Sequence, residues 1–119
     1  MARILIADDA LFMRFTIKRT LNQAGHEVVG ECENGQMAVD AYATVKPDLV
    51  FMDITMPELD GLAALQAIRG MDDTARVVMC SALGHGNKVR EALAAGARDF
   101  IVKPFTPEQI LEAVTKALA

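Results

Sequence analysis

Short apolar runs alternate with helical patterns five times along the chain, and this alternation limits the possible folds more than any other feature. The apolar runs are too short for helices, and most are continuous, which predicts strands that are buried on both faces. They lie at residues 4–7, 28–29, 49–52, 77–80 and 100–102. Between the runs, apolar residues recur three or four positions apart, as on the buried face of a helix. The sequence therefore predicts five strands that alternate with five helices.

The expected helices show both their buried faces and their ends. The buried faces are formed by Met13, Ile17, Leu21 and Ala24; Ala38, Ala41, Tyr42 and Val45; Leu62, Leu65 and Ile68; Val89, Ala92, Leu93 and Gly96; and Ile110, Val114, Ala117 and Leu118. We expect Gly25, Gly70 and Gly96 to end the first, third and fourth helices, because glycine adopts the left-handed cap conformation without strain. The segment 106–109, Thr-Pro-Glu-Gln, is typical of an N-cap with a capping box, so the last helix is expected to begin there.

Strands that are separated by helices pair in parallel through right-handed crossovers. We therefore expect an α/β fold, a (βα)5 doubly wound parallel sheet of five strands with helices on both faces. A chain of 119 residues suits one compact domain, and no repeat or linker divides it. We expect a single domain over residues 1–119, with nothing left for an output domain.

Composition excludes several classes of protein. Hydrophobic residues make up 52% and charged residues 24% of the chain, which argues against disorder. Twelve Lys and Arg against sixteen Asp and Glu give a net charge of −4, which argues against nucleic acid or an anionic membrane as the main partner. Asp8 and Asp9 interrupt the first apolar run too early for a signal peptide or a membrane span, so we expect a cytoplasmic protein. Cys32 and Cys80 are too few for a disulfide scaffold and too widely spaced for a zinc site, so we expect both to be packing residues.

Polar side chains follow four of the five expected strands. These side chains belong to Asp8, Asp9, Asp53, Ser81 and Lys103. In open parallel sheets, ligands bind beyond the carboxyl ends of the strands, so these residues are expected to lie at one edge. The segment 31–35, Glu-Cys-Glu-Asn-Gly, follows the second strand and is typical of an ordinary turn.

Three carboxylates at one edge repel one another, by about 4 kcal/mol for a pair at 4 Å and an effective dielectric near 20. A cation is therefore expected, and oxygen ligands without His or Cys favour Mg²⁺ over Zn²⁺. Asp53 stands alone at the end of the central strand and is the best candidate for a nucleophile that forms an aspartyl-phosphate. Asp8 and Asp9 are better placed as metal ligands. Lys103 and Ser81 would neutralise and hydrogen-bond a phosphoryl group.

Other phosphate-binding and catalytic sites do not fit the sequence. There is no G-x-x-x-x-G-K-[ST] motif, and the segment 84–86, Gly-His-Gly, lacks the remaining features of a dinucleotide fingerprint. The charges of Asp8 and Asp9 would repel the phosphate of a flavin. His26 and His85 are isolated from each other and from any triad-like context, so we expect a surface role for both.

The motifs at the strand ends strongly resemble those of the receiver domain of bacterial two-component response regulators. They comprise Asp8-Asp9, the segment 53–61 (Asp-Ile-Thr-Met-Pro-Glu-Leu-Asp-Gly), Ser81-Ala82 and Lys103-Pro104-Phe105. The resemblance covers essentially the whole chain, and residues 8–14, 80–82 and 99–105 are most similar to the single-domain chemotaxis regulators. It implies a flavodoxin-like fold with strand order 2-1-3-4-5. In that order Cys32 and Cys80 lie three strands apart and cannot form a disulfide.

The resemblance also implies roles for the acidic residues. Asp53 would accept a phosphoryl group from a phosphohistidine of a sensor histidine kinase. Asp9, Asp53 and the main-chain carbonyl of Thr55 would bind Mg²⁺, and Asp8 would act through a coordinated water.

Three further residues are assigned by the same resemblance. Lys103 would contact the phosphoryl oxygens, and its bond to Pro104 is expected to be cis. Ser81 would hydrogen-bond the phosphoryl group, and Phe100 would occupy the switching aromatic position. In the family threonine is frequent at the position of Ser81 and tyrosine at that of Phe100. We hypothesise that phosphorylation draws the Ser81 hydroxyl inward and vacates space that the Phe100 ring enters.

As a member of this family, the protein would be a monomer that catalyses only its own phosphorylation and dephosphorylation. Its output partner would be the flagellar motor switch protein, with a phosphatase as a possible further partner. Two alternatives stay open. One is a phosphorelay receiver without motor output. The other is a phosphatase or phosphotransferase with an aspartyl-phosphate intermediate, although the nucleophile of such enzymes follows the first strand in an Asp-x-Asp pattern and the chain has no room for a cap domain.

Overall fold

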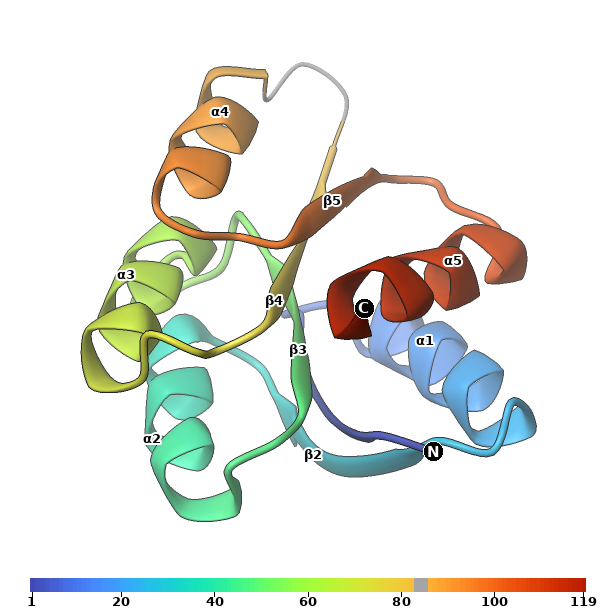
Figure 1. Cartoon of the computed structure of the whole chain (residues 1–119). Coiled ribbons are helices and arrows are strands. Elements are labelled where there is room, and N and C mark those ends of the chain that lie inside the picture. The colour runs from blue at the N-terminus through green and yellow to red at the C-terminus, as the bar shows by residue number, and fades with distance from the viewer. Residues whose placement is uncertain (83–85) are drawn as a thin grey trace.

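The computed structural model of the chain describes residues 1–82 and 86–119, so His85 lies outside the described residues (Figure 1). The described residues form the strands β1 (Arg3–Ala7), β2 (Glu27–Cys32), β3 (Leu49–Asp53), β4 (Val77–Ser81) and β5 (Asp99–Val102). They alternate with the helices α1 (Leu11–Gln23), α2 (Gly35–Val45), α3 (Gly61–Met71), α4 (Gly86–Ala94) and α5 (Pro107–Leu118). The strands pair in parallel in the order β2-β1-β3-β4-β5. The predicted α/β fold and its strand order are confirmed.

The helices form two layers on opposite faces of the sheet. Figure 1 shows α2, α3 and α4 on one face and α1 and α5 on the other. Every residue of β3 and β4 is buried, because alternate side chains enter the two cores. Met52 and Met79 pack towards α2 and α3, whereas Phe51 and Cys80 pack towards α1 and α5. Burial on both faces explains why these strands read as continuous apolar runs in the sequence.

Strand β2 is longer than the apolar residues 28–29 suggested. Its pairing with β1 slips by one residue, since Ile4 pairs with Val28 but Leu5 pairs with Gly30. A one-residue slip turns all later side chains to the opposite face of a sheet. Glu31 therefore pairs with Ile6 and lies on the α1 side. The prediction of an ordinary turn at 31–35 was wrong at three of its five residues, because Glu31 and Cys32 belong to the strand and Gly35 begins α2.

Most of the predicted helix ends are confirmed. Gly25 and Gly96 have φ angles of 88° and 104° and follow the ends of α1 and α4. At the start of α5, Thr106 Oγ1 accepts a hydrogen bond from the Gln109 amide, and Gln109 Oε1 accepts one from the Thr106 amide, at 3.2 and 2.8 Å. The predicted capping box is therefore present. On α4, Leu93 is 41% exposed and lies outside the buried face in which the sequence placed it.

The predicted end of α3 at Gly70 was wrong. Helix α3 continues to Met71, and the C-cap is Asp72, whose φ of −148° is extended. The Asp72 carboxylate accepts hydrogen bonds from the amide and the hydroxyl of Thr74, at 3.0 and 2.6 Å. This local turn competes with further helix, so α3 ends at Met71, one residue beyond the glycine.

Both cysteines are free and buried, in agreement with the sequence. His26 is half-buried, and its Nδ1 accepts a hydrogen bond of 3.0 Å from the amide of Ala2. This histidine therefore anchors the start of β1. None of the helices in residues 1–82 and 86–119 has the length and apolar character needed to cross a membrane.

Candidate functional site

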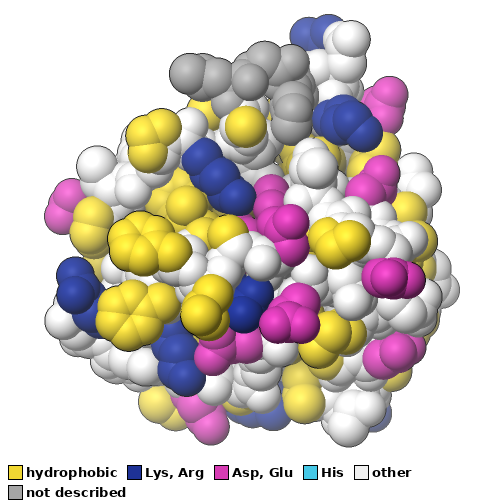
Figure 2. All heavy atoms as spheres, turned by 180° about the vertical axis from the view of Figure 1, so that it is seen from behind, with side chains coloured by type: hydrophobic (Ala, Val, Ile, Leu, Met, Phe, Trp, Pro, Cys, Tyr) yellow, Lys and Arg dark blue, Asp and Glu magenta, His cyan; other side chains and the backbone are white. Residues whose placement is uncertain are grey.

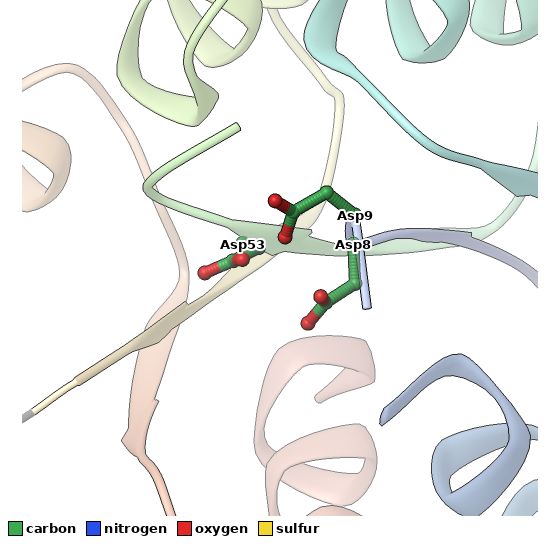
Figure 3. A group of neighbouring side chains, drawn as sticks. All are labelled: Asp8, Asp9 and Asp53. Carbon is green, nitrogen blue, oxygen red and sulfur yellow. The ribbon is translucent and has the colours of Figure 1, made fainter. Parts of the chain in front are cut away.

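Four strands bring the polar residues of the sequence to one edge of the sheet. Asp8 follows β1, Asp53 ends β3, Ser81 ends β4, and Lys103 follows β5. Figure 3 shows the side chains of Asp8, Asp9 and Asp53 as neighbours, the first two from the chain after β1 and the third from β3. One oxygen atom from each of these three carboxylates lies within 4.8 Å of the other two. This acidic cluster lies at the carboxyl edge, where parallel sheets bind ligands.

The three carboxylates differ in their surroundings. Asp8 is 1% exposed and Asp53 is 7% exposed, whereas Asp9 is exposed to solvent. Asp8 is held firmly, because its amide donates to the main-chain oxygen of Cys32 at 3.0 Å and its Oδ1 accepts from the amide of Ala10 at 2.9 Å. The cluster therefore has a rigid, buried side and an open side.

Lys103 supplies the positive charge of the site. Its Nζ lies 2.9 Å from Asp8 Oδ2 and 3.3 Å from Asp53 Oδ2. Its amide donates to the main-chain oxygen of Ser81 at 2.7 Å, which ties the end of β5 to the end of β4. The bond between Lys103 and Pro104 is cis, as the resemblance to receiver domains implied.

Burial and neighbouring charges shift the pKa values of Asp53 and Lys103 in this site. Burial, together with the charge of Asp8, raises the pKa of Asp53 to about 6, although attraction to Lys103 acts in the opposite direction. Burial alone would lower the pKa of Lys103, but the hydrogen bond to Asp8 and the charges of both carboxylates outweigh it and raise this pKa. One ammonium group faces three carboxylates, so the site has an excess of negative charge. Its donor atoms are all oxygens, which fits a hard divalent cation such as Mg²⁺.

The segment after β3 folds back tightly over the end of the strand. A Cβ atom at Gly61 would lie 1.9 Å from the main-chain oxygen of Asp53, so only glycine fits there. The amide of Gly61 donates to the main-chain oxygen of Ile54 at 2.7 Å. The carboxylate of Asp60 caps α3 by accepting from the amide of Ala63 at 2.9 Å. These contacts explain why the sequence has Asp-Gly at the N-cap and first residue of α3.

An open pocket of about 370 Å³ lies over the acidic cluster and is lined by Asp9, Asp53, Thr55, Ala82 and Lys103. Thr55 is thus placed beside the predicted nucleophile. Ser81, at 1% exposure, lies at the end of the strand that pairs with β3. Phe100 does not line this pocket; it lies on β5 and is 38% exposed. The structure therefore brings Asp9, Asp53, Thr55 and Lys103 together around one pocket, and neither Ser81 nor Phe100 is among its lining residues.

Arg14 was not recognised as a site residue from the chemistry of the strand ends. It lies on α1, is only 6% exposed, and its Nη1 donates to the main-chain oxygen of Asp8 at 2.6 Å. A signal was present in the sequence, because Arg14 lies three residues before Ile17 and seven before Leu21, on the same buried face. A charged residue at such a position needs a specific partner.

The fold agrees with comparisons to known proteins. Residues 4–115 match the family described as the response regulator receiver domain. The chemotaxis protein CheY of Bacillus subtilis (strain 168) is 56% identical over 116 residues, which are 98% of this chain and 97% of that protein. The chemotaxis protein CheY of Thermotoga maritima is 51% identical over 114 residues, which are 96% of this chain and 95% of that protein. The crystal structure of the CheX-CheY-BeF3-Mg²⁺ complex from Borrelia burgdorferi matches with a TM-score of 0.94 and 34% identity, covering 98% of this chain and 89% of that one.

The chain therefore belongs to the response regulator receiver domain family. Its likeness to chemotaxis proteins named CheY, at 51% and 56% identity, supports a chemotaxis response regulator.

Proposed function

We propose that the chain is a phosphoryl-accepting signalling switch that is phosphorylated on Asp53 by a sensor histidine kinase in the presence of Mg²⁺. One observation carries this proposal: Asp53 lies 3.3 Å from the Lys103 ammonium group and within 4.8 Å of two further aspartates, at the open carboxyl edge of the sheet. A nucleophilic carboxylate needs such surroundings, since an adjacent cation can neutralise the phosphoryl oxygens.

Asp8, Asp9 and Asp53, with the main-chain carbonyl of Thr55, would hold the Mg²⁺ ion, Asp8 through a water. When bound, Mg²⁺ offsets the repulsion among the carboxylates and withdraws charge from the phosphoryl oxygens. The oxygen-only donor set supports this assignment. So does the likeness to a CheY that was crystallised with Mg²⁺ and BeF3.

In the proposed reaction, a carboxylate oxygen of Asp53 attacks the phosphorus atom of the phosphohistidine. The oxygen–phosphorus bond forms while the phosphorus–nitrogen bond breaks, and the bonding electron pair returns to the imidazole nitrogen. Lys103 Nζ, 3.3 Å from Asp53 Oδ2, would pair with a phosphoryl oxygen, and the Ser81 hydroxyl would donate to another. Attack of water on the same phosphorus returns Asp53 to its carboxylate. The chain thus acts on itself and not as a classical enzyme.

The response to phosphorylation would involve Ser81 and Phe100. A movement of the Ser81 hydroxyl towards the phosphoryl group would let the Phe100 ring, now 38% exposed, turn inward. Moving an equilibrium from 1:99 to 99:1 needs about 5.5 kcal/mol. One charge-assisted hydrogen bond contributes about 1.5–3 kcal/mol. A bound output partner would therefore supply part of the bias.

We further propose that the protein acts as a single receiver domain and a monomer, with the flagellar motor switch protein as its output partner and a phosphatase as a second partner. The names of the relatives support a role in chemotaxis. Figure 2 shows acidic side chains next to basic and apolar ones across the rear face, a mixed surface that does not favour nucleic acid.

Incubation with Mg²⁺ and acetyl phosphate, followed by mass spectrometry, tests the proposal. Wild type should gain one phosphoryl group, Asp53→Asn should gain none, and Asp40→Asn, which changes an exposed aspartate on α2, should behave as wild type. A modification that persists in Asp53→Asn would refute the assignment of the nucleophile. Steady hydrolysis of a small phosphate ester at about 1 s⁻¹ or faster would favour an enzyme instead. Failure of the phosphorylated protein to bind flagellar switch peptides would favour a phosphorelay receiver.

A further inference from the structure

Arg14 connects the acidic cluster to the end of the edge strand β2. Its Nη1 donates to the main-chain oxygen of Asp8 at 2.6 Å. Its Nε lies 3.5 Å from Oε1 of Glu31, and its Nη2 lies 3.7 Å from Oε1 of Glu33. The guanidinium group thus bridges the segment after β1 and the end of β2. Its side chain is 8% exposed, whereas those of Glu31 and Glu33 are 32% and 69% exposed.

The slip between β1 and β2 makes this bridge possible. Without it, Glu31 would pair with Ala7, whose side chain lies in the core under α2 and α3. With the slip, Glu31 pairs with Ile6 and faces α1, where Arg14 and Lys18 reach it. A strand irregularity that aims one acid at a buried arginine is typical of a functional feature.

The contacts of Arg14 affect the position of Asp9, the residue of the acidic cluster whose carboxylate has the fewest contacts of its own. Asp9 is exposed, and within the described part of the chain no hydrogen bond to its carboxylate is found. The position of this carboxylate therefore depends on the main chain of Asp8 and Asp9. The Asp8 amide is fixed by β2 and its side chain by Ala10 and Lys103. Arg14 fixes the one remaining polar group of Asp8, its main-chain carbonyl.

We propose that Arg14 is a positioning residue for the cation site: by holding the Asp8 carbonyl, it fixes the main chain that presents Asp8 and Asp9 to a divalent cation. This inference rests on the proposed function, because it assumes that these carboxylates bind Mg²⁺. Partners that orient metal ligands commonly contribute 10- to 100-fold to metal affinity. Arg14 itself touches neither the ion nor the phosphoryl group.

The direction in which the Mg²⁺ affinity changes when Arg14 is replaced distinguishes a positioning role from a purely electrostatic one. Arg14 carries a positive charge, so its removal would strengthen the binding of a cation if charge alone mattered. A positioning role predicts the opposite, a weaker Mg²⁺ affinity. A purely structural role would lower the stability of the fold and leave the Mg²⁺ affinity unchanged.

Titration calorimetry with Mg²⁺ on the full chain is the first measurement. We expect Arg14→Met to weaken Mg²⁺ binding about tenfold. Arg14→Lys, which keeps the charge and one donor for the Asp8 carbonyl, should recover part of the loss. Lys18→Met is the matched control, since Lys18 lies on the same helix and pairs with the same Glu31 at 3.1 Å without reaching Asp8. Affinity of Arg14→Met equal to or above that of wild type would overturn the proposal.

Amide hydrogen exchange without Mg²⁺ is the second measurement, and it does not depend on the proposed function. The amides of Asp8 and Ala10, which donate to Cys32 O and Asp8 Oδ1, should exchange faster in Arg14→Met and at the wild-type rate in Lys18→Met. Unchanged exchange in Arg14→Met would overturn the proposal. Should that variant fail to fold, Arg14→Gln, which also lacks the guanidinium group, is measured in its place by the same criterion. Wild type that binds no Mg²⁺ would instead contradict the proposed function.

Discussion

The side chains of Lys103 and Asp8 meet across 95 positions of sequence, with 2.9 Å between Nζ and Oδ2. The same Nζ lies 3.3 Å from Asp53 Oδ2, so one ammonium group forms ion pairs with two buried carboxylates. Each carboxylate alone would be costly to bury in its charged form. The ammonium group therefore opposes the rise in the pKa of Asp53 that burial and Asp8 cause, and it links the ends of two strands in the site.

Removal of this ammonium group should raise the pKa of Asp53 above its value of about 6, because the attraction of Lys103 is one of the influences that lower it. NMR titration of the Asp53 carboxyl carbon in Lys103→Met, with EDTA present, measures the change. Lys116→Met, which removes an exposed lysine that pairs with Glu112 on α5, should leave this pKa as in wild type. An unchanged or lower pKa in Lys103→Met would contradict the geometry of the site.

Asp53→Asn should stabilise the protein at neutral pH. The folded-state pKa of about 6 lies above the ordinary value of 3.8, so the folded state binds the proton more tightly than the unfolded state. The contribution of Asp53 to the stability of wild type should therefore fall as the pH rises from about 4 to about 6 and stay constant above that. The shift corresponds to at most about 3 kcal/mol. Solvent screening at the open side of the site reduces this to about 1–2 kcal/mol.

Urea unfolding of wild type and Asp53→Asn in EDTA, between pH 3.5 and pH 8, tests this dependence. The higher free energy of unfolding of Asp53→Asn relative to wild type should disappear below about pH 4, where Asp53 is protonated in both the folded and the unfolded state. Saturating Mg²⁺ should restore the stability of wild type. Asp40→Asn should show no such pH-dependent gain. A wild type that becomes more stable between pH 4 and pH 6 relative to Asp53→Asn would refute the prediction.

Gly61→Ala should destabilise the protein by about 1–3 kcal/mol, as overpacking commonly does. The added Cβ would lie 1.9 Å from the Asp53 main-chain oxygen, which is backbone and cannot move aside without displacing Asp53. Gly70→Ala is the matched control on the same helix, because nothing lies within 4 Å of its added Cβ. Gly70→Ala should increase the free energy of unfolding by about 0.5–1 kcal/mol, because alanine has a higher helix propensity than glycine. Thermal unfolding of both variants measures the difference, and equal effects would contradict the close approach.

Thr106→Ala should lower the free energy of unfolding by about 0.5–2 kcal/mol, since it removes the side chain that caps α5. Its Oγ1 accepts from the Gln109 amide at 3.2 Å. Thr115→Ala lies within the same helix and should be neutral or slightly stabilising, as alanine favours the helix interior. Chemical unfolding compares the two variants. A loss in Thr115→Ala as large as that in Thr106→Ala would show that the cap is not responsible.

The fold could be predicted because its signals are local. Strands β3 and β4 are buried on both faces, so they read as continuous apolar runs, and Thr106 marks the start of α5 by its neighbours alone. The site followed from the parallel sheet, since its carboxyl edge had to collect the residues after each strand. Local signals also misled, because the end of α3 is determined by the turn at Asp72 rather than by Gly70.

Features that depend on contacts between distant segments could not be predicted. The length of β2 depends on a register slip against β1, and Gly30 and Glu31 carry no apolar signal. The role of Arg14 required knowing that α1 lies over Glu31 and the main chain of Asp8. The helical period placed Arg14 on a buried face, but only the tertiary structure gives it a partner.

The contact between Lys103 and Asp8 also makes the site depend on completion of the fold. Its two residues come from opposite ends of the chain, so the pair exists only after β5 has joined the sheet. In a nascent or partly unfolded molecule, Asp8 lacks this counter-charge. The complete arrangement of charges therefore exists only in fully folded copies of the chain.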